Sequence, residues 1–402
     1  MPVQFSSRLP WQGLTNRFTQ QLLALRERGV PLLDLVVSNP TRALPSLYPD
    51  SLLTPLSSPE ALRYEPSPQG ARSARQAIAD YYHRRGLHID PDHLVLCAST
   101  SEAYSWLFQL LCNPGDVVLF PEPSYPLLPF LANLSSVAVQ PYPLRFDGRF
   151  HLSVPELAAA CSDRTRALVS VSPNNPTGSY LRQHEAERML SLCAERDLAL
   201  IVDEVFSDYA CADPCPQEGP RLLSCAELPS SLAQIPALRF VLSGFSKVLG
   251  LPQVKLGWIL VAGPEPLRSD AQARLELIAD TFLSVGTPIQ LAVPQLLSAR
   301  DHLFSGIQRR ISDSLTILQT QLAGSAVTLL PVEGGWYAVL RLPQLVSEEE
   351  WLLRLLTEDH MIVHPGYFFD FPDEAYVVVS LLSDPADLSE GIRRLLAKVE
   401  SL

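Results

Sequence analysis

Two lysines stand close together between two apolar runs of the chain. The segment "SGFSKVLGLPQVKLGW" covers Ser243 to Trp258, follows "RFVL" and precedes "ILVAG", and contains Lys247 and Lys255. A lysine amine forms imines with carbonyl compounds when a fraction of it is unprotonated, and burial lowers its pKa. Lys247 follows a predicted buried strand and has apolar neighbours, so it is a candidate nucleophile rather than a solvated surface residue.

Polar residues also gather where other predicted strands end. "CASTSEA", "PEPSYP", "SPNNPTG" and "DEVF" each follow an apolar run. In an open parallel sheet, ligands bind beyond the carboxyl ends of the strands. Each loop alone is weak evidence, because Asn-Pro-Thr-Gly is often only a turn and a strand-end aspartate often caps a helix. Their conjunction predicts one ligand site.

The elements that must position these loops alternate along the chain. Strands are predicted at "HLVLCA", "DVVLFP", "TRALVSVSP", "LALIVDEVF", "RFVLSG" and "WILVAG", with helices such as "SEAYSWLFQLL" and "EAERMLSLCAERD" between them. The strands are nearly continuous apolar runs, which is typical of a sheet covered by helices on both faces. Beyond Gly263, long helices and then "WYAVLRL", "EEEWLLRLLTED" and "YVVVSLL" predict a smaller α+β domain.

Length and composition fit an acidic enzyme of two domains. The 402 residues are 47% hydrophobic and 18% charged, with a formal net charge of −12. We expect a large domain over residues 46–290 and a small domain formed by residues 1–45 and 291–402. The negative charge argues against a nucleic-acid partner. The apolar stretches are too short to span a membrane.

The N-terminus and the cysteines predict a cytoplasmic protein. "MPVQFSSRLPWQG" lacks the basic region and apolar core of a signal peptide. The seven cysteines are scattered and odd in number, so reduced thiols are expected. Cys211 and Cys215 are four residues apart without a further pair of ligands, and no metal site is expected there.

The order of three of these residues resembles class I/II aminotransferases, the pyridoxal-phosphate-dependent enzymes of fold type I in the aspartate aminotransferase superfamily. Asp203 follows Asn175 by 28 residues, and Lys247 follows Asp203 by 44. The resemblance also takes in "LVVSNPT", "YEPSPQGARSARQAIADYY", "PSYP" and "EGGWYAVLRLP". It implies an α/β fold with a large, mostly parallel seven-stranded sheet flanked by helices, plus a smaller α+β domain.

The resemblance assigns catalytic roles to the strand-end residues. Lys247 would form an aldimine with pyridoxal 5'-phosphate. Asp203 would pair with the pyridinium nitrogen, so that the ring can act as an electron sink. Asn175 would donate its amide to the phenolic oxygen of the ring. Tyr125 would stack on the ring, for which an offset geometry is favoured.

The phosphate of the cofactor would be bound at a predicted helix start. Thr100 and Ser101 open the helix "EAYSWL", and a helix N-terminus offers free N–H groups to an anion. Simple capping by these residues is compatible with that role. Ser246 and Lys255 complete the expected set. Tyr64 resembles a tyrosine that reaches the phosphate from the other subunit, which implies a homodimer with composite active sites.

The implied reaction moves an amino group from an amino acid to a 2-oxo acid. Lys247 would shuttle a proton between the substrate and the cofactor. Another fold-type-I reaction, catalysed by a lyase, a decarboxylase or a synthase, is the alternative. A non-catalytic protein that binds pyridoxal phosphate is less favoured, because the lysine, the aspartate and the asparagine are all present.

Three departures from the family pattern lie around the expected cofactor. Lys255 replaces an arginine, and an ammonium cannot bind phosphate in the bidentate way of a guanidinium. Gly244 replaces a serine, for which Ser243 or Ser246 would have to substitute. Phe206 replaces a tyrosine, which removes a hydroxyl that would bond the ring. Tyr209, three residues later, is a candidate replacement if a helix follows.

A fourth departure concerns the substrate. Val378, in "YVVVSLL", stands where the family has an arginine that grips the α-carboxylate. Either another arginine takes that role, or the substrate is not an ordinary α-amino acid held in the ordinary way. "HPGYFFDF" and "GGWY" would line an aromatic substrate pocket. Trp336 and Tyr337 would equally serve as core residues of the small domain.

Overall fold

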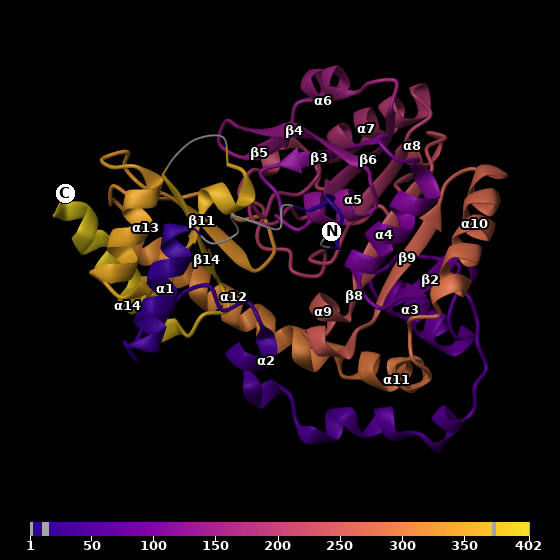
Figure 1. Cartoon of the computed structure of the whole chain (residues 1–402), viewed down its shortest axis with the longest axis horizontal. Helices are drawn as coiled ribbons and strands as arrows, with labels where there is room; N and C mark the ends of the chain where they lie inside the picture. Colours follow the sequence, from indigo (N-terminus) through magenta and orange to yellow (C-terminus); the bar gives the residue numbers. More distant parts are fainter. Residues whose placement is uncertain (1–2, 10–15, 372–374, 402) are drawn as a thin grey trace.

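The computed structural model describes residues 3–9, 16–371 and 375–401, and two sheets organise it (Figure 1). The larger sheet runs in the order β2-β9-β8-β7-β6-β3-β4-β5. All of its strands run parallel except β9 and β5. Their bounds are Leu94–Cys97, Gly257–Ala262, Arg239–Gly244, Ala199–Asp203, Thr165–Val171, Val117–Glu122, Ala138–Phe146 and Phe150–Leu152, in that order.

The mostly parallel sheet confirms the predicted fold class, with one difference in the number of strands. The described residues form eight strands rather than seven. The short strand β5 pairs antiparallel with the end of β4, where Phe146 lies opposite Phe150. This hairpin adds a strand at the edge of the sheet without changing its parallel centre.

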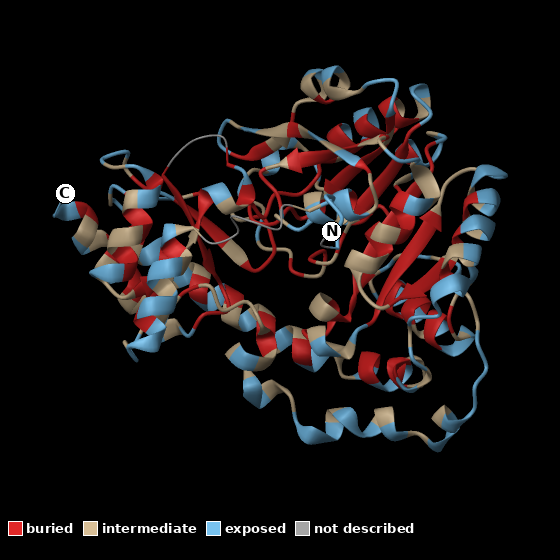
Figure 2. Cartoon of the chain, in the orientation of Figure 1, coloured by how far each residue is buried: buried red, intermediate tan, exposed pale blue. Residues whose placement is uncertain are grey.

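Helices cover the large sheet on both faces, because its strands are apolar on both sides. Along β7, Leu200 and Val202 join one buried cluster, while Ala199 and Ile201 join another. The first cluster also contains residues of α3 (Arg72–Arg84), α6 (Val154–Ala160), α7 (Gln183–Glu195) and α11 (Thr287–Ser298). The second contains residues of α4 (Thr100–Leu111), α5 (Leu128–Leu134) and α10 (Leu267–Phe282). Figure 2 shows this layering as buried strands between helices with exposed outer faces.

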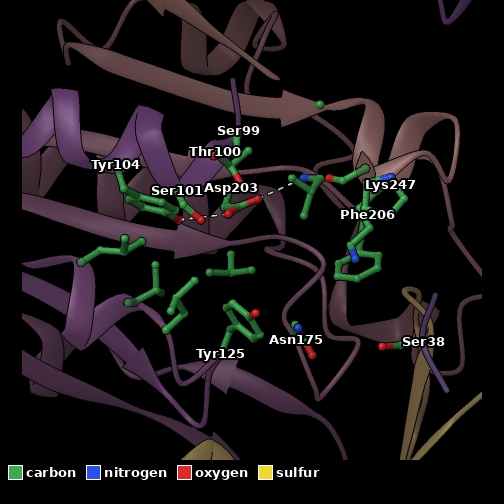
Figure 3. A pocket seen from close by; sticks show the side chains of 18 of the residues that line it. Ser38, Ser99, Thr100, Ser101, Tyr104, Tyr125, Asn175, Asp203, Phe206 and Lys247 are labelled. Atoms are coloured by element: carbon green, nitrogen blue, oxygen red, sulfur yellow. Dashed lines mark hydrogen bonds between the residues drawn. The ribbon is translucent and has the colours of Figure 1, made fainter. Parts of the chain in front are cut away.

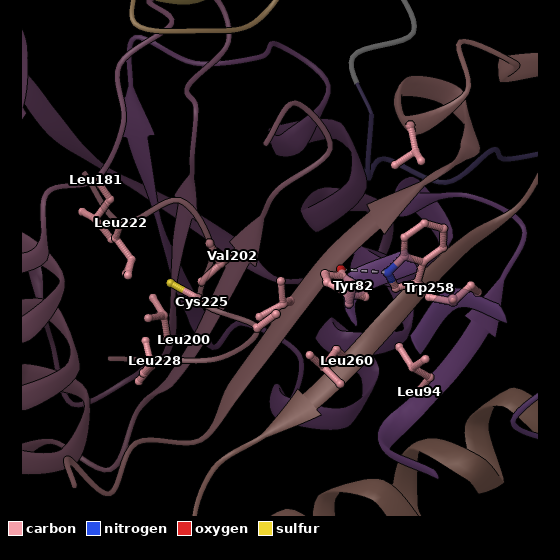
Figure 4. Packing of buried hydrophobic residues seen from close by; sticks show 14 of the residues in the cluster. Tyr82, Leu94, Leu181, Leu200, Val202, Leu222, Cys225, Leu228, Trp258 and Leu260 are labelled. Carbon is pink, nitrogen blue, oxygen red and sulfur yellow. Dashed lines mark hydrogen bonds between the residues drawn. The ribbon is translucent and has the colours of Figure 1, made fainter. Parts of the chain in front are cut away.

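Aromatic side chains fill the first cluster near β9. The Trp258 indole nitrogen donates to the Tyr82 hydroxyl over 3.1 Å (Figure 4). Both side chains are buried, so the bond satisfies polar groups that would otherwise be unpaired in the core. Strand β9 is therefore anchored close to the segment that carries Lys255.

The smaller sheet is antiparallel, in the order β10-β11-β14-β13. Its strands span Thr328–Leu329, Tyr337–Arg341, Tyr376–Ser380 and His364–Pro365. They pack with α1 (Arg17–Glu27), α12 (Arg300–Leu322), α13 (Glu348–Thr357) and α14 (Pro385–Glu400). Strand β1 (Leu33–Asp34) pairs parallel with β12 (Met361–Ile362), so the N-terminal segment packs with the C-terminal part. The division at residues 45 and 290 stays a prediction, and the second of these residues falls inside α11.

A surface arm leads from the smaller sheet to the larger one. It comprises α2 (Pro40–Ala43), η1 (Pro45–Leu47), η2 (Asp50–Ser57) and η3 (Pro59–Leu62), and it runs along α11 at the bottom of Figure 1. Leu53 and Leu62 on this arm are exposed. The remaining short helices are η4 (Pro91–His93), η5 (Pro216–Glu218), α8 (Ser230–Ala233), α9 (Phe245–Val248), η6 (Pro252–Val254) and η7 (Gly366–Phe369).

A buried ion pair joins the two sheets. Arg182, just before α7, contacts Glu333, just before β11, at 3.0 Å, and both side chains are almost fully buried. The neighbouring Gly334 forms a β-bridge with Ala210 and lies against Gly178. These contacts hold the start of β11 close to the carboxyl ends of the large sheet.

Within the described residues, no single helix has the length and apolar character needed to cross a membrane. Among the helices that the structure describes, the pair α10 and α11 meets those two criteria when taken together, across a bend of 119°.

Candidate active site

A cavity of about 290 Å³ lies at the carboxyl ends of the large sheet's parallel strands. It is lined by residues that follow β2, β3, β6, β7 and β8, together with residues from the N-terminal segment and β11 (Figure 3). The sequence-predicted residues that it brings together are Thr100, Ser101, Tyr125, Asn175, Asp203, Ser246, Lys247 and Lys255. The predicted convergence follows from the parallel strands, whose carboxyl ends meet at one edge.

Lys247 presents its amine to aromatic rings. It lies in the short helix α9, directly after β8. Its Nζ lies 5.0 Å from the ring centre of Phe206 and 4.7 Å from that of Trp336. Burial lowers the pKa of the amine to about 8, and the nearby Asp203 partly opposes this shift. A minor fraction of the amine is therefore unprotonated near neutral pH, far more than for an ordinary lysine, and this neutral form is the one that a nucleophile or base requires.

Asp203 ends β7 in the middle of the cavity. Its carboxylate accepts hydrogen bonds from the Val205 backbone N–H at 3.1 Å and from the Tyr104 hydroxyl at 3.2 Å. Figure 3 shows it between Tyr104 and the side of the cavity that holds Lys247. Burial raises the pKa of the carboxyl to about 6, although both hydrogen bonds lower it. A cationic partner would therefore be stabilised at this position.

Asn175 lies in the turn that follows β6, and its neighbour holds that turn. Asn174 accepts a hydrogen bond from the Thr177 hydroxyl at 2.9 Å and donates to the Pro123 carbonyl at 3.2 Å. By contrast, Asn175 Oδ1 is buried and has no hydrogen-bond partner. An unpaired amide on a cavity wall is a polar group that a ligand can satisfy.

Hydroxyl groups and a second lysine also line the cavity. Ser99 is the N-cap of α4, and its Oγ accepts from the Glu102 N–H at 3.2 Å. Ser99, rather than Thr100 or Ser101, is therefore the residue that caps this helix, while phosphate binding by Thr100 and Ser101 stays a prediction. Lys255 follows η6 in a left-handed conformation, with φ of 56°, and also lines the cavity.

Tyr209 does not replace the hydroxyl that is absent at Phe206, and the packing around Gly244 explains why a glycine stands there in place of a serine. In the described part of the chain, β7 is followed directly by a turn at residues 205–208 and not by the helix that the expectation required. The Tyr209 hydroxyl donates instead to the backbone carbonyl of Lys247 at 2.8 Å, so it fixes the lysine from behind rather than lining the cavity. A Cβ on Gly244 would stand 2.9 Å from the Leu256 carbonyl oxygen, so β9 leaves little room for a serine. Of the two candidate substitutes, Ser246 lines the cavity and Ser243 is not among the lining residues.

Two further predicted positions lie outside the cavity. Tyr64 is 77% exposed on the surface arm's far end and does not line the cavity of its own chain. Val378 is fully buried on β14, opposite Val339. The predicted contribution of Tyr64 to a partner's site stays a prediction, since it concerns a second copy of the chain.

The sequence reading missed several lining residues. Tyr104 lies one helical turn after Thr100, so the helical period could have indicated it. Ser38 follows "LVV" in the motif "LVVSNPT", whose pattern assigns no role to the serine, and it lines the cavity. For Trp336 and Tyr337, the sequence is equally compatible with a place in the core and a place in the pocket. Trp336 is fully buried beneath the Lys247 amine, while Tyr337 lines the cavity.

The described residues contain no group of three or more histidine, cysteine, aspartate or glutamate side chains arranged to hold a metal ion.

Comparison with known proteins gives a consistent result across most of the chain. Residues 50–395 match the model of the family "Aminotransferase class I and II". The chain is 25% identical over 394 residues to glutamate-pyruvate aminotransferase of Haemophilus influenzae, which covers 94% of this chain and 92% of that protein. It is 27% identical over 340 residues to arginine–pyruvate transaminase of Pseudomonas aeruginosa, covering 81% and 80%.

The same architecture occurs in solved structures. Alanine aminotransferase of Pyrococcus furiosus superposes with a TM-score of 0.85 and 20% sequence identity, over 99% of this chain and 100% of that one. At this identity the similarity concerns the fold.

Proposed function

Because this chain belongs to the class I and II aminotransferase family and is an aminotransferase, we propose that its cavity binds pyridoxal 5'-phosphate and transfers an amino group from an amino acid to a 2-oxo acid. The observation that carries the proposal is the Lys247 amine, which is enclosed in the cavity with a pKa near 8 and faces the side that holds Asp203. The relatives named as acting on alanine, arginine or glutamate make α-amino acids the first donors to examine.

The residues of the cavity fit this cofactor. A buried carboxylate with a raised pKa is available for a cationic ring nitrogen at Asp203. Asn175 lines the cavity, where its Nδ2 group would donate to a ring oxygen. Hydroxyl groups, a helix N-terminus and Lys255 suit a phosphate group. Nucleophile, ring partner and anion site are thus present together in one cavity.

We assign the binding roles accordingly. Thr100, Ser101, Ser246 and Lys255 would hold the phosphate, and Tyr125 would pack on the ring. The amine of Lys247 would bond the aldehyde carbon until a substrate amine displaces it. Pyridoxal phosphate supplies an aldehyde that exchanges amino groups and a conjugated ring that takes up the electron pair left at a deprotonated carbon.

Lys247 then has the position and the pKa of a proton carrier. As a free amine it removes a proton from the reacting carbon, and as an ammonium ion it returns one. Its backbone is fixed by the bond from Tyr209. The rings of Phe206 and Trp336 hold its ammonium form by cation–π attraction, which offsets part of the cost of burial.

Asp203 keeps a negative charge where a ring nitrogen would be protonated. Tyr104 and the Val205 N–H orient its carboxylate. Above pH 6 the carboxylate is mostly ionised, and a cationic partner would lower its pKa further. Asp203 would thereby favour the protonated, electron-withdrawing form of a bound pyridoxal phosphate ring.

Three broader assignments belong to the same proposal. The protein would be a cytoplasmic homodimer in which Tyr64 reaches the phosphate bound by the partner chain. The exposure of the Tyr64 side chain, together with that of Leu62 nearby, supports an interface on this part of the surface. The large domain would span residues 46–290, with the rest forming the small domain.

A half-reaction tests the proposed function. Protein loaded with pyridoxal phosphate is mixed with single amino acids in the absence of a 2-oxo acid. We expect one equivalent of pyridoxamine phosphate and one of 2-oxo acid for each site. Release of carbon dioxide or ammonia without pyridoxamine phosphate would instead show lyase or decarboxylase chemistry.

A further inference from the structure

Two aromatic rings, those of Phe206 and Trp336, lie against the Lys247 amine, and Tyr337 packs against Phe206. We call these three side chains the aromatic wall. The ring centres of Phe206 and Trp336 are 5.3 Å apart, and those of Phe206 and Tyr337 are 6.4 Å apart. Phe206 and Tyr337 line the cavity, and Trp336 lies beneath Lys247 Nζ. A substituent on a carbon bonded at this amine would therefore meet ring faces.

The small sheet extends this apolar surface behind Tyr337. Opposed residues of an antiparallel pair share a face, as do alternate residues of one strand. Tyr337 lies opposite Ser380 and Val339 lies opposite Val378, so all four share the cavity side of the sheet. There, Val339 and Val378 are sealed in an apolar cluster that includes Phe150, Phe369 and Phe371.

The residues of this cluster are buried, and two hydrogen bonds connect this part of the small sheet to residues next to the cavity. Residue Phe369 accepts a hydrogen bond from the Ser124 N–H at 2.9 Å, next to the cavity residue Tyr125. Ser380 donates to the Val37 carbonyl at 2.6 Å, next to the cavity residue Ser38. The face that bears Val378 is therefore a packed part of the structure.

The charged side chains that line the cavity already have other roles in the proposed function. Of the described residues that line it, the cations are Lys247 and Lys255 and the anion is Asp203. In the proposed function Lys247 bonds the aldehyde and Lys255 neutralises the phosphate. A substrate carboxylate placed against the aromatic wall would lose its hydration without gaining a cation, which is unfavourable.

We propose that this site recognises the amino donor through an apolar substituent packed on the aromatic wall rather than through its carboxylate. Primary amines with an aromatic or large aliphatic substituent and no carboxylate are then donors as efficient as the corresponding amino acids, or better. The inference rests on the proposed function and names its substrate class.

The exchange balances with the cofactor alone. The donor loses its C–N bond and two electrons, and leaves as an aldehyde. The aldehyde carbon of pyridoxal phosphate gains the amino group and those two electrons as pyridoxamine phosphate forms. Water released during the exchange equals the water consumed, and no other oxidant is needed.

The test compares matched donors in single turnovers of the loaded protein. 2-Phenylethylamine and L-phenylalanine differ only in the carboxylate. We expect the amine to form pyridoxamine phosphate with an efficiency at least equal to that of the amino acid. A cation that clamps the carboxylate would favour L-phenylalanine by about 30-fold or more, because such contacts contribute about 2 kcal/mol or more. That preference would overturn the inference.

L-Alanine and L-glutamate separate failure of the inference from failure of the proposed function. If either of them yields pyridoxamine phosphate while 2-phenylethylamine does not, transamination stands and the inference is wrong. If no donor of either kind yields it, the proposed function itself fails. Calorimetry with two unreactive probes, 3-phenylpropanoate and 3-phenyl-1-propanol, supplies a readout independent of turnover, and we expect the carboxylate to bind no more tightly than the alcohol.

Two variants locate any carboxylate recognition. Arg42 is an exposed residue of α2, four positions after Ser38. We expect Arg42→Ala to leave unchanged the ratio of the efficiency with 2-phenylethylamine to that with L-phenylalanine. A selective loss of L-phenylalanine turnover in Arg42→Ala would identify Arg42 as the clamp and overturn the inference. Val378→Arg should shift the ratio toward L-phenylalanine, with Val378→Leu as the folding control. If Val378→Arg does not fold, the wild-type ratio alone decides.

Discussion

At the scale of single residues, the chemistry depends on how burial sets two pKa values in opposite directions. The same enclosure lowers the pKa of the Lys247 amine to about 8 and raises that of the Asp203 carboxyl to about 6. Each shift disfavours the charged form of its group. Between these values the amine is mostly protonated and the carboxylate mostly ionised, and each group stabilises the charge of the other.

The pH dependence of cofactor capture follows from the first of these values. Because the pKa of Lys247 is lowered, its neutral form appears at lower pH than for an ordinary lysine, whose pKa is 10.5. We expect the rate at which the apoprotein bonds pyridoxal phosphate to rise with pH and level off just above pH 8. Stopped-flow absorbance measures this rate. A rate that keeps rising toward pH 10, as for N-acetyl-lysine, would contradict the lowered pKa.

The role of Lys255 predicts a loss specific to the phosphate. A hydrogen bond to a charged group contributes about 1.5–3 kcal/mol, so Lys255→Ala should weaken pyridoxal phosphate binding by roughly 10-fold to 100-fold. Binding of unphosphorylated pyridoxal should hardly change, and equilibrium dialysis compares the two. Lys398→Ala is the matched control, because Lys398 pairs with Glu358 and Asp359 on the surface. Equal losses for both ligands would place Lys255 away from the phosphate.

At the scale of elements, the turns at the carboxyl ends of the strands position the residues that line the cavity. The site tolerates little change in these turns. The turn after β6 approaches the start of β11 through Gly178 and Gly334. A Cβ on Gly178 would stand 2.6 Å from the Gly334 carbonyl oxygen. Because Gly178 follows Asn175 and Gly334 precedes Trp336, this contact sets the distance between the two sides of the site.

Replacing Gly178 with alanine should therefore damage both stability and activity. The residue has φ of 71°, and its Cβ would also collide with backbone. Strain and overpacking of this kind cost about 1–3 kcal/mol each. Gly29→Ala is the control, because Gly29 has φ of 69° and nothing within 4 Å of the added Cβ. Urea denaturation should show a clearly larger decrease in the free energy of unfolding for Gly178→Ala than for Gly29→Ala. Equal decreases for the two variants would contradict the proposed contact.

The elements also show what the sequence could predict. The central strands are apolar on both faces, so their ends, and the polar residues there, could be located from the sequence. The sequence pattern does not indicate strand β4, because Pro141 and Pro143 interrupt it; a strand near the sheet edge tolerates these prolines. The contact of Lys247 with Phe206 and Trp336 could not be predicted, since it joins three segments far apart in the chain.

At the scale of the whole molecule, two sheets are held against one cavity by buried ion pairs and backbone contacts. Arg182 contacts both Asp213 and Glu333, and it connects the helix layer of the large sheet to the start of β11. Removing one partner of a buried ion pair leaves an uncompensated charge, so such a connection resists separation. The exposed arm, by contrast, is available to a second copy of the chain.

Mixing two inactive variants tests the composite dimer. Lys247→Ala lacks the nucleophile, and Tyr64→Ala would lack a phosphate contact in the partner's site. A mixed dimer regains one intact site, so random pairing should restore roughly a quarter of the wild-type sites. Turnover at a cofactor concentration that saturates only the wild type measures this recovery. A mixture of Lys247→Ala with Lys255→Ala is the control and should regain nothing. No recovery in the first mixture would contradict the role of Tyr64.

The central claim is that Lys247 bonds the cofactor, and the composition of the chain makes it directly testable. The sequence contains only three lysines, Lys247, Lys255 and Lys398. Borohydride reduction of the protein loaded with pyridoxal phosphate, followed by peptide mass spectrometry, identifies the residue that carries the cofactor. We predict one pyridoxyl group per chain, on the peptide that contains Lys247, and none on Lys247→Ala. Modification of Lys255 or Lys398 instead, or an unmodified Lys247 in active protein, would contradict the account.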